Sequence, residues 1–166
     1  MTYEKFMQIA LDEAKNAYNN GQIPIGATLV IDGKIIDTNS NNQIEQKNTF
    51  NHAENILIQR NSSKIREARF AGKQIELYST VEPCIMCFGA AVHNRIKKIV
   101  YACPDPCAGS TNIKSPTEWY STIWPERIKG PFAKESCELM IKFMEENSSN
   151  WKETLELFKK LRQEIL

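Results

Sequence analysis

The fold is decided by residues 74–102, QIELYSTVEPCIMCFGAAVHNRIKKIVYA. Residues 74–80 alternate apolar and polar side chains, which is typical of a strand. Pro83 suits the first position of a helix, so a helix is predicted over residues 84–93. Residues 97–102 then predict a second strand. Because a strand–helix–strand unit places its two strands parallel, this segment predicts an α/β sheet with a parallel pair.

Upstream of this segment, the sequence predicts a helix and then a hairpin. Apolar side chains recur at helical spacing over residues 3–17, and Gly21 follows as a stop signal. The apolar runs GATLVI and KIIDTN flank Asp32-Gly33. Both of these turn residues tolerate positive φ, so the two runs are expected to form an antiparallel hairpin.

The remaining segments complete the predicted element order. A helix is expected to begin near His52, with Asn51 as its N-cap. The polar and basic stretch 61–73 has no decisive pattern, and the proline-rich stretch 103–131 indicates mostly loop. A short strand and two closing helices are predicted at residues 127–129, 133–146 and 150–163. Together these elements predict one α/β domain over residues 1–166, in which helices cover both faces of a mixed sheet.

Composition indicates an ordinary globular domain. The chain has 166 residues, of which 42% are hydrophobic and 25% charged. That length is enough for one domain with a substantial core. The net charge is +1, and residues 140–166 balance Lys and Arg against Glu, so the charge pattern does not favour a polyanionic partner. Without a signal-like start or a run of about 20 apolar residues, we expect a cytoplasmic protein with no membrane span.

Two of the five cysteines lie in the motif Cys84-x-x-Cys87. In a reducing compartment this spacing favours metal or redox chemistry over a disulfide. Both sulfur atoms can reach one ion, because residues three apart at a helix start lie on the same side. His52 begins the preceding predicted helix and supplies a third ligand. Three protein ligands are typical of catalytic zinc, which keeps a position for water and lowers the pKa of that water to about 7.

Glu54 is the predicted proton carrier, because it lies close to His52 and is not needed as a ligand. Adding water to a C=N carbon requires a proton to leave the water and a proton to reach the ring nitrogen. A further proton must reach the departing amine. One carboxylate can make these transfers in turn. The residues therefore predict hydrolytic removal of an exocyclic amine as ammonia.

A four-cysteine zinc ribbon is the alternative interpretation of the metal site, because Cys103 and Cys107 follow the C-x-x-C motif at near-ribbon spacing. A ribbon would leave His52 and Glu54 without a role. The residues after Cys87 also indicate a helix running into a strand rather than a second knuckle, so the deaminase-type site is favoured. The remaining cysteines are then predicted to be buried small hydrophobic side chains: Cys103, Cys107 and Cys137.

His-x-Glu followed by Pro-Cys-x-x-Cys resembles the signature of the cytidine deaminase superfamily. Residues 6–36 and 77–106 are similar to bacterial tRNA adenosine deaminases and to small guanine or cytosine deaminases. The resemblance implies a three-layer α/β/α fold with a mixed five-stranded sheet. It also implies that the zinc ligands and the catalytic acid are the residues already named, and that the protein is a homodimer.

The same resemblance suggests where substrate binds. Asn41 matches an asparagine that helps to hold substrate in relatives. Asp105, which precedes a proline, is a candidate substrate contact and a candidate turn residue. The tRNA enzymes have Lys-Gly where this chain has Cys107-Ala108. We therefore expect a free base or nucleoside as substrate, with tRNA adenosine as the alternative.

Two further interpretations remain open at this point. The chain is either an enzyme or a silent deaminase-like subunit with structural zinc, and the retained Glu54 favours the enzyme. The aromatic side chains of Trp119, Tyr120 and Trp124 lie in a predicted loop, where they suit the core, a dimer interface or stacking on a base.

Overall fold

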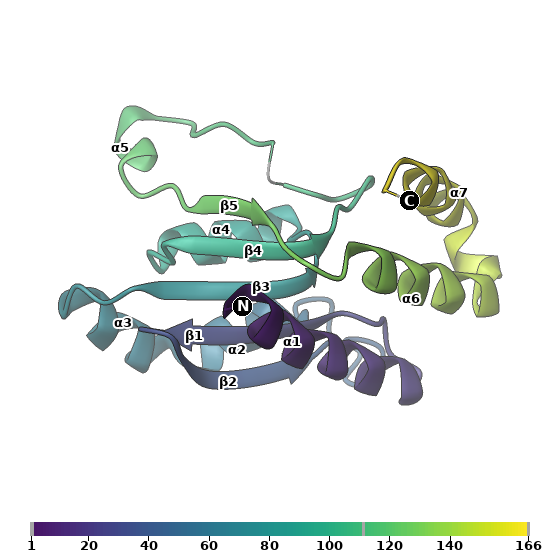
Figure 1. Cartoon of the computed structure of the whole chain (residues 1–166), viewed down its shortest axis with the longest axis horizontal. Coiled ribbons are helices and arrows are strands. Elements are labelled where there is room, and N and C mark those ends of the chain that lie inside the picture. Colours follow the sequence, from purple (N-terminus) through teal and green to yellow (C-terminus); the bar gives the residue numbers. More distant parts are fainter. Residues whose placement is uncertain (1, 111, 166) are drawn as a thin grey trace.

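A computed structural model describes residues 2–110 and 112–165 of the chain. Helices and strands alternate through most of it (Figure 1). In chain order they are α1 (Thr2–Asn19), β1 (Gly26–Ile31), β2 (Lys34–Ser40), α2 (Ala53–Arg60), α3 (Ser62–Phe70), β3 (Ile75–Val81), α4 (Ile85–His93), β4 (Lys98–Cys103), α5 (Glu118–Ser121), β5 (Glu126–Lys129), α6 (Ala133–Glu146) and α7 (Ser148–Ile165).

The five strands form one mixed sheet in the order β2-β1-β3-β4-β5. Strand β1 is antiparallel to β2 and to β3, whereas β3, β4 and β5 run parallel. The predicted parallel pair and the predicted hairpin are both confirmed. The hairpin turns through Asp32 at φ 48° and Gly33 at φ 73°, the backbone region that the Asp-Gly pair was expected to supply.

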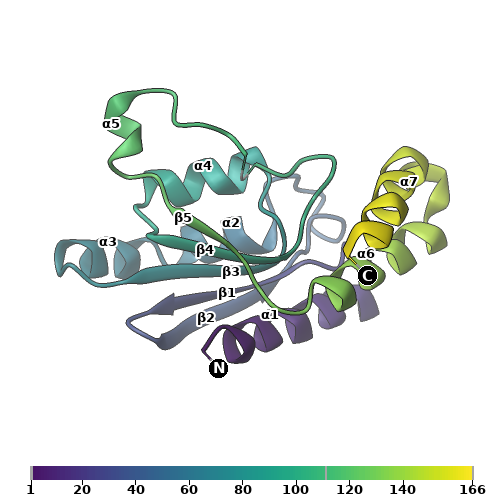
Figure 2. The same ribbon diagram turned by 45° about the horizontal axis from the view of Figure 1, so that its top comes forward.

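Helices cover both faces of the sheet, which confirms the predicted three-layer α/β/α fold (Figure 2). Neighbouring residues in a strand point to opposite faces, and in this sheet both of them are buried. Leu29 and Leu77 pack with α2, α3 and α4, while Val30 and Tyr78 pack with α1. Helix α7 packs on α6 beyond the end of the sheet. Within residues 2–110 and 112–165, no helix is both long and apolar enough to cross a bilayer.

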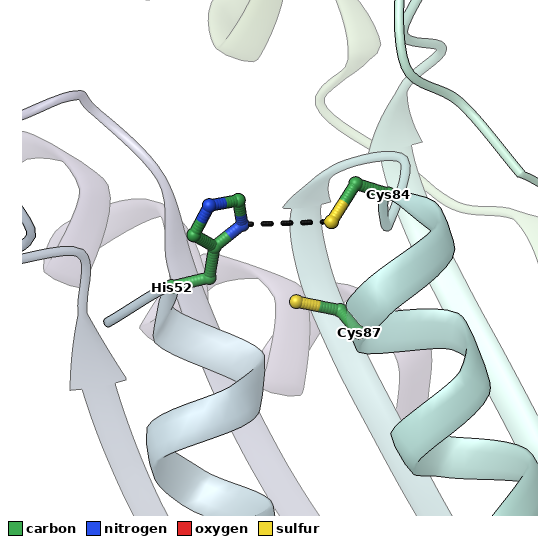
Figure 3. A group of neighbouring side chains, drawn as sticks. All are labelled: His52, Cys84 and Cys87. Atoms are coloured by element: carbon green, nitrogen blue, oxygen red, sulfur yellow. Dashed lines mark hydrogen bonds between the residues drawn. The ribbon is translucent and has the colours of Figure 1, made fainter. Parts of the chain in front are cut away.

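The start of α2 differs from the sequence-based expectation. Its N-cap is His52 rather than Asn51, and the His52 side chain makes no capping hydrogen bond. The backbone of His52 is extended, at φ −74° and ψ 147°, as is usual for an N-cap. Its ring points toward α4 (Figure 3). The undecided stretch 61–73 contains α3, which buries only Ile65 and Ala68.

Asp37 on β2 holds α2, the helix that carries Glu54, against the sheet. Its carboxylate accepts hydrogen bonds from Arg60 Nε at 2.7 Å and from Asn61 Nδ2 at 2.6 Å. Burial raises the pKa of Asp37, but the Arg60 guanidinium and the Asn61 amide outweigh that effect. The pKa of Asp37 therefore lies below its ordinary value.

We predict that Asp37→Asn lowers the free energy of unfolding at neutral pH by at most about 1 kcal/mol, because the ion pair is partly open to solvent. A lowered pKa means that the ionised carboxylate stabilises the fold above the unfolded pKa. This contribution is lost as the pH falls through the folded pKa. The free energies of unfolding of the wild type and the variant, measured in urea, should therefore become equal at acid pH. Asp12→Asn, which loses a surface contact to Lys15, is the matched control. A gap that stays constant across pH would contradict this role.

Candidate metal and catalytic site

The predicted metal ligands lie together at the starts of two helices. Figure 3 shows the His52 ring, at the start of α2, facing the sulfur atoms of Cys84 and Cys87 at the start of α4. One donor atom from each residue lies within 4.8 Å of the other two. No other such group of three His, Cys, Asp or Glu residues is found in residues 2–110 and 112–165.

The donor set fits a zinc ion. One imidazole nitrogen and two sulfur atoms are borderline-soft ligands of the kind that zinc prefers, and three of them leave one position open. Cys84 and Cys87 lie at the N-terminal end of α4, where the helix dipole favours thiolates. His52 and Cys84 are only half-buried, and both line a cavity.

Local electrostatics prepare Cys84 for a cation. The hydrogen bond from Cys87 is the main cause that lowers the pKa of Cys84 to about 4, burial opposes it, and His52 lowers it further. The pKa of Cys87 is raised, first by its bond to Cys84 and then by burial. The contact between Cys84 Sγ and His52 Nδ1 is 3.6 Å and raises the pKa of His52. A bound metal replaces the protons that these groups share.

Glu54 is the second residue of α2, two residues after His52, and is 3% exposed. Its Oε1 accepts a hydrogen bond from Ser79 at 3.1 Å, and its Oε2 accepts one from the Cys87 thiol at 3.8 Å. Burial is the main cause that raises the pKa of this carboxyl. The side chain is therefore fixed beside the metal position, and it lines the same cavity as His52 and Cys84.

Both residues predicted to contact substrate line this cavity of about 260 Å³. Asn41 is 1% exposed, and its Oδ1 accepts a hydrogen bond from the backbone nitrogen of Gln43. Asp105 also forms the turn that its sequence suggested. Its Oδ1 accepts hydrogen bonds from the backbone nitrogens of Cys107 at 2.8 Å and Ala108 at 3.0 Å.

The sequence analysis missed the wall that the C-terminal helices contribute to the cavity. This wall consists of Met140, Met144, Trp151, Thr154 and Phe158 from α6 and α7. The helical spacing of these apolar residues was visible in the sequence, but spacing alone does not separate a core-facing stripe from a stripe that faces a cavity.

The family model for the cytidine and deoxycytidylate deaminase zinc-binding region matches residues 1–103. The chain belongs to this deaminase family. It therefore contains a zinc-binding deaminase domain, and the His52, Cys84 and Cys87 cluster lies within the matched residues. The cavity wall from α6 and α7 lies outside them.

Relatives and solved structures agree with this assignment. The chain is 33% identical to a tRNA-specific adenosine deaminase of Agrobacterium fabrum, over 85% of this chain and 93% of the relative. A structure from a study of A-to-I editing by tRNA:A34 deaminases matches with a TM-score of 0.63 and 33% identity, covering 82% of this chain and 99% of that one. A guanine deaminase from Nitrosomonas europaea matches with a TM-score of 0.67 and 20% identity over 83% and 82%, and this shows the shared fold alone.

The four cysteines of the alternative ribbon do not come together. Cys103 and Cys137 are buried in one hydrophobic cluster, and their thiols donate to the backbone carbonyls of Pro104 at 3.2 Å and Phe158 at 3.8 Å. The prediction of buried hydrophobic side chains is confirmed for these two residues. It is wrong for Cys107, which is exposed and lines the cavity.

The aromatic segment lies away from the cavity. Trp124 packs edge-on against Phe88 of α4, with ring centroids 5.1 Å apart, and Tyr120 packs on the same core. Trp119 is 60% exposed, and the Arg95 guanidinium stacks on it. None of the three lines the cavity that holds His52 and Glu54. Stacking on a base in this cavity is therefore excluded for the segment within this chain.

Proposed function

We propose that the chain is a zinc-dependent hydrolytic deaminase that converts adenosine to inosine in a tRNA anticodon loop. The observation that carries this proposal is the 33% identity to a tRNA-specific adenosine deaminase, which extends over nearly the whole of both chains. It reverses our expectation from the sequence, which ranked a free base or nucleoside first. A tRNA substrate is consistent with a cytoplasmic location.

In this proposal each site residue has one role. His52, Cys84 and Cys87 hold zinc, which when bound supplies a Lewis acid that activates water. Glu54 takes a proton from the attacking water as the oxygen adds to C6 of the purine, and it delivers that proton to N1. Glu54 then takes the second proton of the added oxygen and passes it to the amine, which leaves as ammonia. The C6 carbonyl of inosine forms as the C–N bond breaks.

Asn41 and Asp105 are proposed to hold the substrate in the cavity. An adenosine in RNA reaches the buried Glu54 only after it leaves its base stack, as in other enzymes that act on bases. The cost of unstacking is smallest in a loop, which supports an anticodon loop rather than a duplex as the target.

We predict that the wild-type protein forms inosine in an anticodon stem-loop RNA that has an unpaired adenosine. The assay would measure ammonia release and RNA mass, in parallel with free adenine, adenosine, guanine and cytidine. RNA binding should weaken with salt, because phosphate contacts release counterions. Turnover of free substrates alone would overturn the tRNA assignment. Failure with every substrate would overturn deamination itself.

A free purine base or nucleoside is the second candidate substrate, and the wall from α7 favours it. Trp151, Thr154 and Phe158 help to line this cavity of about 260 Å³. Drug-sized ligands occupy sites of roughly 300 Å³ or more, so this cavity suits a single base or nucleoside. Turnover of the free substrates in the assay above, without inosine in RNA, is the result that this candidate predicts.

We further propose that residues 1–166 form one domain and that two copies of it form a homodimer, as the family resemblance suggests. Light scattering of the purified protein would test the dimer. A mass equal to that of a single chain over the assay concentration range would contradict it.

A further inference from the structure

Two polar atoms in the cavity have no partner. Within residues 2–110 and 112–165, several side-chain nitrogen and oxygen atoms are buried without a hydrogen bond, and only two of them belong to residues that line the cavity. These two are Nδ2 of Asn41, a donor, and Oε1 of Gln43, an acceptor. Because buried polar atoms are nearly always paired, a donor and an acceptor that remain unpaired beside Glu54 point to a ligand that supplies both partners.

A backbone hydrogen bond fixes the orientation of the Asn41 amide. The backbone N–H of Gln43 donates to Asn41 Oδ1 at 3.0 Å. A backbone N–H can donate only to the amide oxygen, so Asn41 Nδ2 must point the other way. The next two residues are held as well, because the backbone nitrogens of Ile44 and Glu45 donate to Gln22 Oε1 at 3.2 and 3.1 Å. The backbone is therefore hydrogen-bonded at Gln43 and at the two residues that follow it.

The depth of each residue indicates which part of a substrate it meets. Glu54 and Asn41 both line the cavity and are only 3% and 1% exposed. Gln43 is only half-buried, so it lies less deep in the protein than these two residues. Since the reacting C6 and N1 atoms of a purine must lie at Glu54, the opposite side of the purine, at N9, extends toward the mouth. We assign Gln43 to that side because it is less buried than Glu54 and Asn41.

We propose that Gln43 is a specificity-determining residue whose Oε1 accepts a hydrogen bond from a donor at the N9 side of a purine. In an RNA substrate this donor is the ribose 2′-hydroxyl, and in a free base it is the N9–H group. The inference rests on the proposed deamination, because it takes the reacting end of the purine from the position of Glu54. A substrate without such a donor leaves Oε1 buried and unpaired, which disfavours its binding.

The experiment compares two matched pairs of substrates. One pair is the anticodon stem-loop RNA with adenosine or 2′-deoxyadenosine at the target position, and the other is adenine and 9-methyladenine. For the pair that the wild type uses, we expect loss of the donor to lower kcat/KM about tenfold, mostly through KM. The readout is the kcat/KM of the substrate with the donor divided by that of the substrate without it. Gln43→Leu should reduce this ratio to near one. Gln43→Glu keeps an acceptor and should retain the wild-type ratio.

Gln46→Leu is the matched control, because Gln46 lies in the same loop but is exposed and does not line the cavity. Its ratio should equal that of the wild type, and zinc content should be unchanged in all variants. A ratio near one in Gln43→Leu with the two RNA substrates identifies the ribose 2′-hydroxyl as the donor. A ratio near one with adenine and 9-methyladenine identifies N9–H. The role of Gln43 is overturned if Gln43→Leu keeps the wild-type ratio. It is also overturned if the ratio of the wild type is already near one. If the wild type deaminates none of the four substrates, deamination itself fails, and this role fails with it.

Discussion

Glu54→Gln should reduce turnover by roughly 10²–10⁴-fold, because a group that acts as general acid and base contributes about that factor. Glutamine keeps the shape of the side chain and can still accept the hydrogen bond from Ser79, which is 3.1 Å from Glu54 Oε1 in the wild type. It cannot take up and return a proton. The catalytic loss should therefore appear in kcat, whereas zinc content and thermal stability stay near those of the wild type.

The measurement pairs turnover with zinc stoichiometry in the same preparation. Glu45→Gln is the control, since Glu45 is exposed and lies on the nearby loop. Near-normal turnover of Glu54→Gln with a full complement of zinc would end the claim that Glu54 carries the protons. Turnover that is lost only together with zinc would instead give Glu54 a structural role.

Replacing any one of His52, Cys84 or Cys87 should lower zinc affinity by more than about 100-fold. Loss of a residue that merely supports a ligand already costs 10- to 100-fold, and loss of a ligand costs more. His52→Ala, Cys84→Ser and Cys87→Ser should each lose activity together with zinc. The donor atoms of all three residues lie within 4.8 Å of one another, so each variant removes one ligand of the same site.

Cys107→Ser is the matched control for these variants, because Cys107 is exposed and lines the same cavity. It should keep one zinc per chain, as measured by metal analysis after dialysis. Loss of zinc in Cys107→Ser, with zinc retained in His52→Ala, would restore the four-cysteine ribbon. It would contradict the site that the structure brings together.

Local sequence signals predict the centre of this fold well. The Asp32-Gly33 turn and the strand–helix–strand segment after Gln74 are determined by backbone preferences and by short-range periodicity. The metal ligands follow from the same elements, because His52 and Cys84 both lie where a helix begins. The grouping of these residues was therefore predictable once the elements were in place.

The periphery was less predictable, for physical reasons. Helix α3 buries only Ile65 and Ala68, so its apolar pattern is too sparse to stand out. Asn51 has a typical capping side chain, but the helix begins at Ala53, so His52 is the N-cap. The contribution of Trp151 to the cavity depends on how α7 folds back on α6, which is a tertiary contact that no local pattern encodes. Gln43 stood out only once its unpaired oxygen was located in the cavity.

Zinc K-edge X-ray absorption of the purified protein tests the central claim most directly. A site formed by His52, Cys84 and Cys87 predicts one zinc per chain with two sulfur neighbours at about 2.3 Å and nitrogen or oxygen neighbours at about 2.0–2.1 Å. The sulfur count should fall to one in Cys84→Ser if any metal remains. Four sulfur neighbours, or a spectrum that does not change in His52→Ala, would contradict the site.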